Sequence, residues 1–297
     1  MALGILLAFG AAFGFGFNQI FVRLATQRIS GPATAFFAAA TGATMATTLA
    51  LIFNFEDFKH LPAIAIPWFI LLAVLHSPIS RVLNFTAISM IGAARAAPMG
   101  SFSPLASAIL AIAILNERPS LLVYLGTIIV VGGMTLVVTG GMRGQRDRPN
   151  LSYNNWGYLM SFGAAAGFGA VSVLAKHINT EFSPPLVTVA LSLLIGTFML
   201  SILTHRQVVS SFAIGRRRYL FLSVLSGFCS GFGAICLFVA LGRAPVTVVA
   251  PIGFAAPLVT LVTSQIFLRR LESINPAIIA GTALSVAGIA LVVLGRA

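Results

Sequence analysis

The stretch AARAAPMGSFSPLASAILAIAIL, residues 93–115, carries two prolines six positions apart, Pro98 and Pro104, inside an otherwise apolar run. The same spacing returns at Pro251 and Pro257, in VTVVAPIGFAAPLVTLVTSQIFL, and each proline lies 153 residues after its counterpart (98 to 251, 104 to 257). Proline removes a backbone hydrogen bond and clashes with the preceding helical turn. Inside a membrane such a break is tolerated only where neighbouring helices or a wet cavity satisfy the freed carbonyl groups. We therefore expect both stretches to be broken helices that border a central path.

The composition indicates an integral membrane protein. Of 297 residues, 58% are hydrophobic and 8% are charged, with a mean hydropathy of +1.01, whereas a soluble domain carries about 25% charged residues. Long uncharged runs such as Leu121–Met142 suit spanning helices of about 20 residues and not the short alternating strands of a barrel. The net charge of +12 comes from basic residues in short loops, so we do not expect nucleic acid as a partner. Cys229 and Cys236 lack metal or disulfide spacing and are expected to be packing residues.

Charged and turn residues divide the chain into ten apolar segments, so the predicted fold is an all-α polytopic membrane protein. We expect a first five-helix repeat over 1–142, a linker over 143–155 and a second five-helix repeat over 156–297. The predicted helices cover 3–24, 32–54, 65–91, 94–115, 120–141, 156–177, 185–204, 219–242, 245–268 and 275–295.

Internal repetition supports this division. LLAFGAAFGFGF from Leu6 aligns with LMSFGAAAGFGA from Leu159, again at an offset of 153 (6 to 159). Because each half holds an odd number of helices, the second half must enter the membrane from the opposite side. That arrangement is the inverted repeat of secondary transporters, with a substrate site near the midplane between the halves.

The loops also predict an orientation. Twelve Lys and Arg residues follow odd-numbered segments, and five follow even-numbered segments or lie at the C-terminus. The positive-inside rule therefore places the odd loops in the cytoplasm and both termini on the outer, periplasmic side.

Several motifs resemble one family, the EamA-type drug/metabolite transporters. AARAAPMGSFSPLASAILAIAILNERPS, residues 93–120, resembles their signature of small residues, a proline, a second Pro-Leu, an apolar helix and a Glu-containing turn. Residues 244–273 look like a degenerate second copy, and Phe15, Gly16, Asn18 and Arg23 resemble a first-helix pattern in which tryptophan is commoner at the first position. The resemblance implies two inverted five-helix repeats around a central cavity. It also implies export or exchange of amino acids, other metabolites or drugs.

Polar groups at membrane depth mark candidate binding residues, because an ionisable residue there is costly unless it faces a partner or a cavity. Segment 65–91 contains His76, Ser77, Arg81 and Asn84, of which the last three share a helical face at i, i+4 and i+7. Arg81 suits a substrate carboxylate; its alternative is a snorkelling or backbone-bonded role. His76 suits a proton relay or a structural hydrogen bond, and its five-residue distance from Arg81 predicts that the two diverge in angle.

Further candidates come from the other segments. Asn18 occupies the family position, and Phe13 and Phe17 form an apolar stripe that either meets substrate or faces lipid and neighbouring helices. We interpret Glu117 and Glu272 as loop caps. The remaining cavity candidates are serines, and the gating candidates are the four prolines: Ser101, Ser172, Ser230, Pro98, Pro104, Pro251 and Pro257.

The predicted function is secondary transport that exports small metabolites, amino acids above all, across a bacterial inner membrane by alternating access. A multidrug or nucleotide-sugar carrier is the alternative. The chain has no nucleotide-binding Gly-x-x-x-x-Gly-Lys loop and no catalytic signature, so we expect neither ATP drive nor enzymatic activity, and no cofactor or metal. The expected partners are a small-molecule substrate and the lipid bilayer, and a monomer suffices because the duplication supplies both halves of a cavity.

Overall fold

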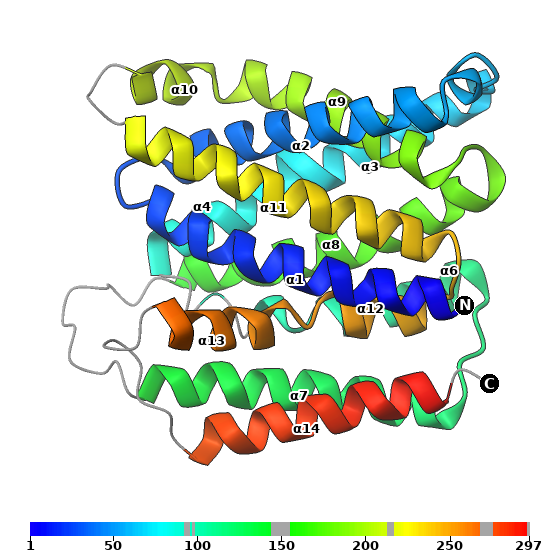
Figure 1. The fold of residues 1–297 in the computed structure, drawn as a ribbon, viewed down its shortest axis with the longest axis vertical. Coiled ribbons are helices and arrows are strands. Elements are labelled where there is room, and N and C mark those ends of the chain that lie inside the picture. Colours follow the sequence, from blue (N-terminus) through cyan, green and yellow to red (C-terminus); the bar gives the residue numbers. More distant parts are fainter. Residues whose placement is uncertain (92–95, 97–98, 144–154, 213–216, 268–275, 296–297) are drawn as a thin grey trace.

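The computed structural model describes residues 1–91, 96, 99–143, 155–212, 217–267 and 276–295, and these are helical apart from short connections (Figure 1). The elements of the first half are α1 (Ala2–Ala25), α2 (Gly31–Phe53), η1 (Glu56–Phe58), η2 (Ala63–Ala65), α3 (Ile66–Val74), η3 (Leu75–Arg81), α4 (Val82–Ile91), α6 (Ser103–Leu115) and α7 (Leu121–Arg143). Those of the second half are α8 (Asn155–Glu181), α9 (Pro185–Leu203), α10 (His205–Phe212), α11 (Arg217–Leu241), α12 (Val246–Gly253), α13 (Ala256–Phe267) and α14 (Pro276–Leu294). The predicted all-α class is confirmed.

Among the described residues, six helical segments are long and apolar enough to cross a membrane. They are Ala2–Ala25, Gly31–Phe53, Ala63–Ile91, Asn155–Glu181, Pro185–Leu203 and Arg217–Leu241. Shorter apolar helices occupy Ser103–Leu115, Leu121–Val137, Val246–Thr260 and Ile279–Leu294. The chain is therefore a multi-pass membrane protein, as the apolar runs predict.

The two proline-containing stretches are both interrupted at equivalent places. α6 begins at Ser103 after a turn at residues 101–102, and α12 and α13 are separated at residues 254–255, which is the same position at the offset of 153. Each interruption lies just before the second proline of its pair, Pro104 or Pro257. Proline is tolerated in a first helical turn, where its missing N–H would have no helical partner. The helices predicted over 94–115 and 245–268 are thus each broken, while Pro98 lies outside the described residues.

Helix packing follows the repeat. α1 packs on α11 and on α12–α13, and its counterpart α8 packs on η3–α4 and on α6. At matching positions, a Cβ added to Gly16 would lie 2.6 Å from Val259 Cβ, and one added to Gly169 would lie 2.9 Å from Ala106 Cβ. Figure 1 shows α1 running away from the end that carries both termini and α8 running towards that end. The two halves therefore repeat one another with opposite direction.

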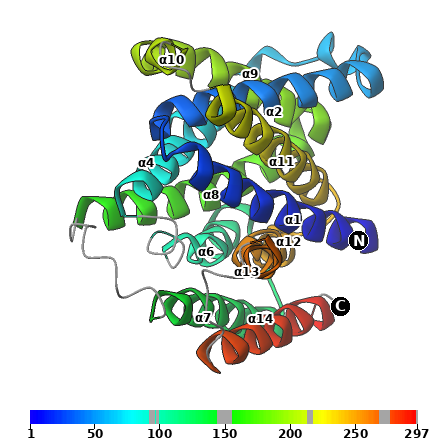
Figure 2. The same cartoon turned by 60° about the vertical axis from the view of Figure 1, so that its left-hand side comes forward.

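α7 and α14 form a pair of their own at one edge of the molecule in both views (Figures 1 and 2). Glycines let their backbones touch: a Cβ on Gly126 would lie 2.7 Å from Gly288 O, and a Cβ on Gly281 would lie 2.7 Å from Gly133 O. Small residues drive helix association in lipid because close approach gains van der Waals contact where no hydrophobic force operates.

Candidate functional site: a buried polar cluster on a π-helix

Segment 63–91 is not a regular α-helix, because residues 75–81 form the π-helix η3 with Pro78 inside it. Pro78 has no N–H to donate and clashes with the turn before it, and a wider turn accommodates both defects. Val82 N–H at the C-terminal end bonds to the carbonyl oxygens of Ile79 and Ser77. Single π-turns inside α-helices often occur at functional sites.

The wider turn corrects one expectation. In a π-helix the backbone bonds join residues five apart, so His76 and Arg81 lie on nearly the same face, although α-helical geometry predicts that they diverge. Both side chains reach α11: the His76 ring stacks on Phe238, with centroids 5.8 Å apart and planes at 26°, and Arg81 Nη1 donates to Ser230 Oγ at 3.3 Å.

His76 is also fixed from a second side. Its Nδ1 lies 3.0 Å from Ser192 Oγ on α9, and only 4% of the residue is exposed. The imidazole is therefore held between α9 and α11. Ser192 is not among the predicted site residues, although a hydroxyl in the middle of an apolar segment at membrane depth is a signal for it.

Arg81 is buried without an acidic partner. The residue is 5% exposed, and among the described residues Ser230 is its one hydrogen-bond partner and none pairs with its Nε. Within the described part of the chain, no carboxylate lies within 4.0 Å of the guanidinium. The side chain does not reach the surface, so it does not snorkel. A positive charge therefore lies inside the helix bundle with no acidic partner among the described residues.

Other polar atoms around η3 are also buried and unpaired. In the part of the chain that the structure describes, Ser77 Oγ and Ser80 Oγ on η3 have no hydrogen-bond partner, and neither does Asn18 Oδ1 on α1, whose residue is 6% exposed. Ser77 packs against Gly196 of α9, and Ser80 packs against Gly167 of α8. A buried polar group without a partner costs about 1–3 kcal/mol, and unpaired buried side-chain atoms also lie outside η3 and α1, for example on Thr34 and Asn179. We call the set formed by His76, Ser77, Ser80, Arg81, Ser192 and Ser230 the η3 polar cluster.

Asn18 lies near the depth of this cluster. A Cβ on Gly14 of α1 would lie 2.7 Å from Cys229 O and from the Cα of Gly233 on α11. α1 and α11 are therefore in contact at that level. α1 and α11 run in opposite directions (Figure 1), and one further turn along α1 brings Asn18 within about a turn of Ser230.

The remaining candidates are distributed over the fold. Asn84 is half-buried on α4, and Ser101 is buried at the helix break. Ser172 is fully buried and donates to Phe168 O of its own helix at 3.2 Å. Pro251 is buried within α12.

The broken helix α6 is tied to α8 beside the cluster. Ser103 Oγ donates to Ala165 O at 2.9 Å, and Ser107 Oγ donates to Pro104 O at 2.8 Å. Pro104 is itself buried, so the first helix break is packed against the second half of the chain.

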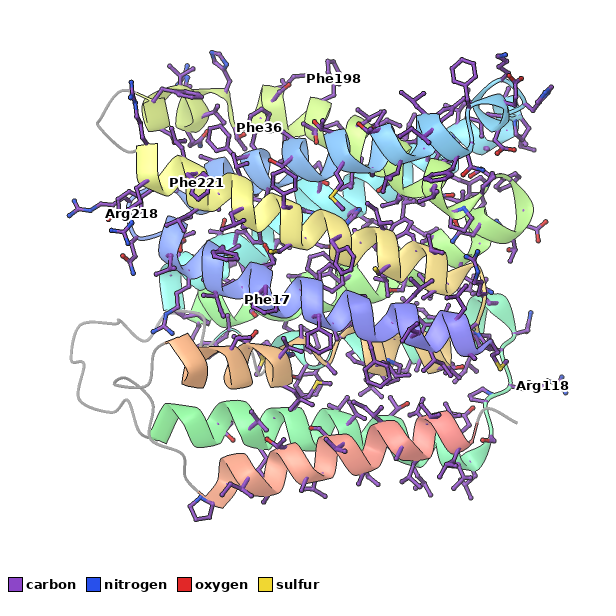
Figure 3. All side chains as sticks on the ribbon, viewed as in Figure 1. Phe17, Phe36, Arg118, Phe198, Arg218 and Phe221 are labelled. Atoms are coloured by element: carbon purple, nitrogen blue, oxygen red, sulfur yellow. The ribbon has the colours of Figure 1, made fainter. Side chains whose placement is uncertain are left out.

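The aromatic stripe of α1 does not join the cluster. Phe13 is 54% exposed, while Ala11 is fully buried, and two residues along an α-helix turn the direction by about 200°. Phe17 is half-buried further along the same helix (Figure 3). The structure therefore places Phe13 on an outward face, in agreement with the alternative that the stripe meets lipid or neighbouring helices.

The structure describes one of the two loop glutamates, Glu117. Glu117 caps the N-terminus of α12 through both carboxylate oxygens, in agreement with its interpretation as a cap. Glu272 lies outside the described residues.

Comparison with known proteins identifies the two halves. The EamA-like transporter family matches residues 2–139 and again residues 155–294. A solved crystal structure of a protein superposes with a TM-score of 0.78 at 16% sequence identity, over 99% of this chain and 97% of the other, which shows a shared fold. A search of curated proteins found no match.

Proposed function

The chain belongs to the EamA-like transporter family, and we propose that it exports small metabolites, amino acids above all, by alternating access. Membership makes it a transporter of the drug/metabolite superfamily, whose members are transporters and not enzymes. The export direction, the amino-acid substrate and the bacterial inner membrane are our proposals.

The burial of Arg81 without a described acidic partner is the main support for the proposed substrate class. A charge at membrane depth is costly, and it is retained where a partner or substrate compensates it. No described carboxylate compensates Arg81, so the substrate supplies the negative charge. The carboxylate of an amino acid matches the planar fork of a guanidinium. Asn18 Oδ1, buried and unpaired, offers an acceptor for the substrate ammonium group.

The same charge argues against cationic drugs. Like charges repel strongly where the effective dielectric constant is low, and the cluster contains no acidic side chain to offset Arg81. A nucleotide-sugar also brings negative charge, so it remains the second candidate within the superfamily, and a substrate panel separates it from amino acids.

We further propose ten spans in two inverted five-helix halves around a central cavity, acting as a monomer with both termini periplasmic. Support comes from the two family matches, from the opposite directions of α1 and α8 (Figure 1), and from the helix breaks at equivalent positions. The excess of basic residues in the odd loops supports the orientation.

Counterflow in proteoliposomes tests the function. Vesicles loaded with one unlabelled amino acid are expected to accumulate the labelled form, and Arg81→Ala is expected to slow this at least tenfold, because it removes a charged hydrogen-bonding partner valued at about 1.5–3 kcal/mol. Arg28→Ala is the matched control, since Arg28 is an exposed loop arginine. Exchange of cationic drugs with no exchange of amino acids would refute the proposed substrate class.

A further inference from the structure

Glu117 joins the two halves of the chain at the end that carries both termini. Its Oε1 accepts from Val246 N at 2.8 Å, and its Oε2 accepts from Thr247 N at 3.0 Å and from Thr247 Oγ1 at 2.8 Å. Asn116, in the left-handed conformation with φ 53°, ends α6 and turns the chain so that Glu117 faces α12. The neighbouring Arg118 marks this end in Figure 3.

These bonds satisfy groups that would otherwise have no partner. The first N–H groups of a helix lack intrahelical acceptors, and a negative charge there interacts favourably with the helix dipole. α12 begins at Val246 with Pro245 as its N-cap residue, which gives no side-chain cap. Glu117, 129 residues away in the sequence, therefore supplies the cap that α12 lacks locally.

Lys176 binds the C-terminal end of α11, the helix that precedes α12. From α8, its Nζ donates to Leu241 O at 2.8 Å and to Ala244 O at 3.3 Å. Leu241 is the last residue of α11 and Ala244 lies in the turn after it, and a positive charge at a helix C-terminus is favourable for the same electrostatic reason. A carboxylate and an ammonium group thus hold the two sides of the 242–245 connection, each with the sign that its helix end favours.

We propose that the Glu117 bonds form a terminal clasp that closes the transport path at the end carrying both termini and must open for substrate to pass there. Lys176, whose contacts lie within the second half, holds the 242–245 connection in position for this clasp. This inference rests on the alternating access proposed above. The Glu117 bonds tie the end of α6 to α12, the first part of the equivalent broken helix in the other half. Halves that move against each other cannot keep a three-bond contact in both states, so the clasp belongs to the state closed at this end.

The expected consequence is measurable without substrate. In a chain with Cys229→Ala and Cys236→Ala, a reporter cysteine is introduced as Ala250→Cys, because Ala250 is fully buried on α12 one turn from Val246. Its labelling by a membrane-impermeant maleimide applied from the side of the termini is measured in membranes. Glu117→Ala is expected to raise the labelling rate about tenfold, equivalent to about 1.4 kcal/mol in the opening equilibrium. Lys176→Met is expected to act in the same direction, and Glu117→Gln, which keeps one acceptor oxygen, to fall between.

Two controls separate a clasp from general loosening. Glu56→Ala removes a glutamate whose exposed contact is with Lys59, three residues away, and is expected to leave labelling unchanged. A second reporter, Ser285→Cys, is buried on α14 and is expected to label equally slowly with and without Glu117→Ala.

Unchanged labelling of Ala250→Cys in the Glu117→Ala chain, or an equal rise at Ser285→Cys, would overturn the clasp. Because the labelling assay uses no substrate, such a result leaves the counterflow result standing. Failed counterflow of every amino acid together with the expected labelling would overturn the proposed substrate and keep the clasp.

Discussion

Gly133→Ala tests the close packing of α7 against α14. An added Cβ at Gly133 would lie 2.5 Å from Ser285 Oγ, 2.6 Å from Ser285 N and 2.7 Å from Gly281 O. Ordinary carbon contacts are about 3.5–4.0 Å, so the shortfall is close to 1 Å. Two of the three obstructing atoms are backbone and cannot rotate away. The helices must therefore separate or shift.

The neighbouring glycine, Gly132, serves as the reference substitution. A Cβ at Gly132 would meet nothing within 4 Å, although it lies in the same helix and gains the same helix propensity, about 1 kcal/mol for Gly to Ala. Overpacking costs about 1–3 kcal/mol and applies only to Gly133. We therefore expect Gly133→Ala to lower the free energy of unfolding by about 1–3 kcal/mol relative to Gly132→Ala, with the propensity gain cancelled in the comparison.

Denaturation of the purified protein in mild detergent, titrated with sodium dodecyl sulfate, measures the two variants side by side. The unfolding free energy of Gly132→Ala is expected to match or slightly exceed that of the parent chain. Equal unfolding free energies for the two variants would refute the backbone contact between α7 and α14. The predicted difference between them comes only from the steric overlap at Gly133.

Two further outcomes follow from the site. Pro104→Ala is expected to slow counterflow several-fold while leaving thermal stability nearly unchanged, because the proline lies in a first helical turn, where its missing N–H costs nothing; undiminished transport would contradict the gating role of the break. Phe13→Ala is expected to keep counterflow within about twofold of the parent, since Phe13 is 54% exposed and surface changes have small effects; a tenfold loss would place Phe13 on the substrate path.

The sequence predicted the large features because they depend on patterns that survive without coordinates. Apolar runs indicate helices, the repeated spacing of Pro98–Pro104 and Pro251–Pro257 indicates paired breaks, and Arg81 inside an apolar segment indicates a costly charge. The described breaks and the burial of Arg81 agree with these expectations.

Other features depend on contacts that no local pattern encodes. Pro78 indicates a defect in a helix, but either a kink or a π-turn resolves it, and the neighbouring helices decide which. Glu117 is recognisable as a cap, whereas its partners at Val246 and Thr247 lie in the other half of the chain. The outward direction of Phe13 was undecidable from periodicity, because lipid and helix interfaces are equally apolar.

The two halves are not chemically equal. At the offset of 153 residues, the counterpart of Arg81 is Ala234 and that of His76 is Cys229, while Ser230, which accepts the Arg81 hydrogen bond, is the counterpart of Ser77. A dimer of two identical first halves would bring two guanidinium groups to one site, and their mutual repulsion at low dielectric would be severe. Because the two halves are fused in one polypeptide, they can differ in sequence: the first half provides the Arg81 guanidinium, and the second provides the Ser230 hydroxyl that orients it.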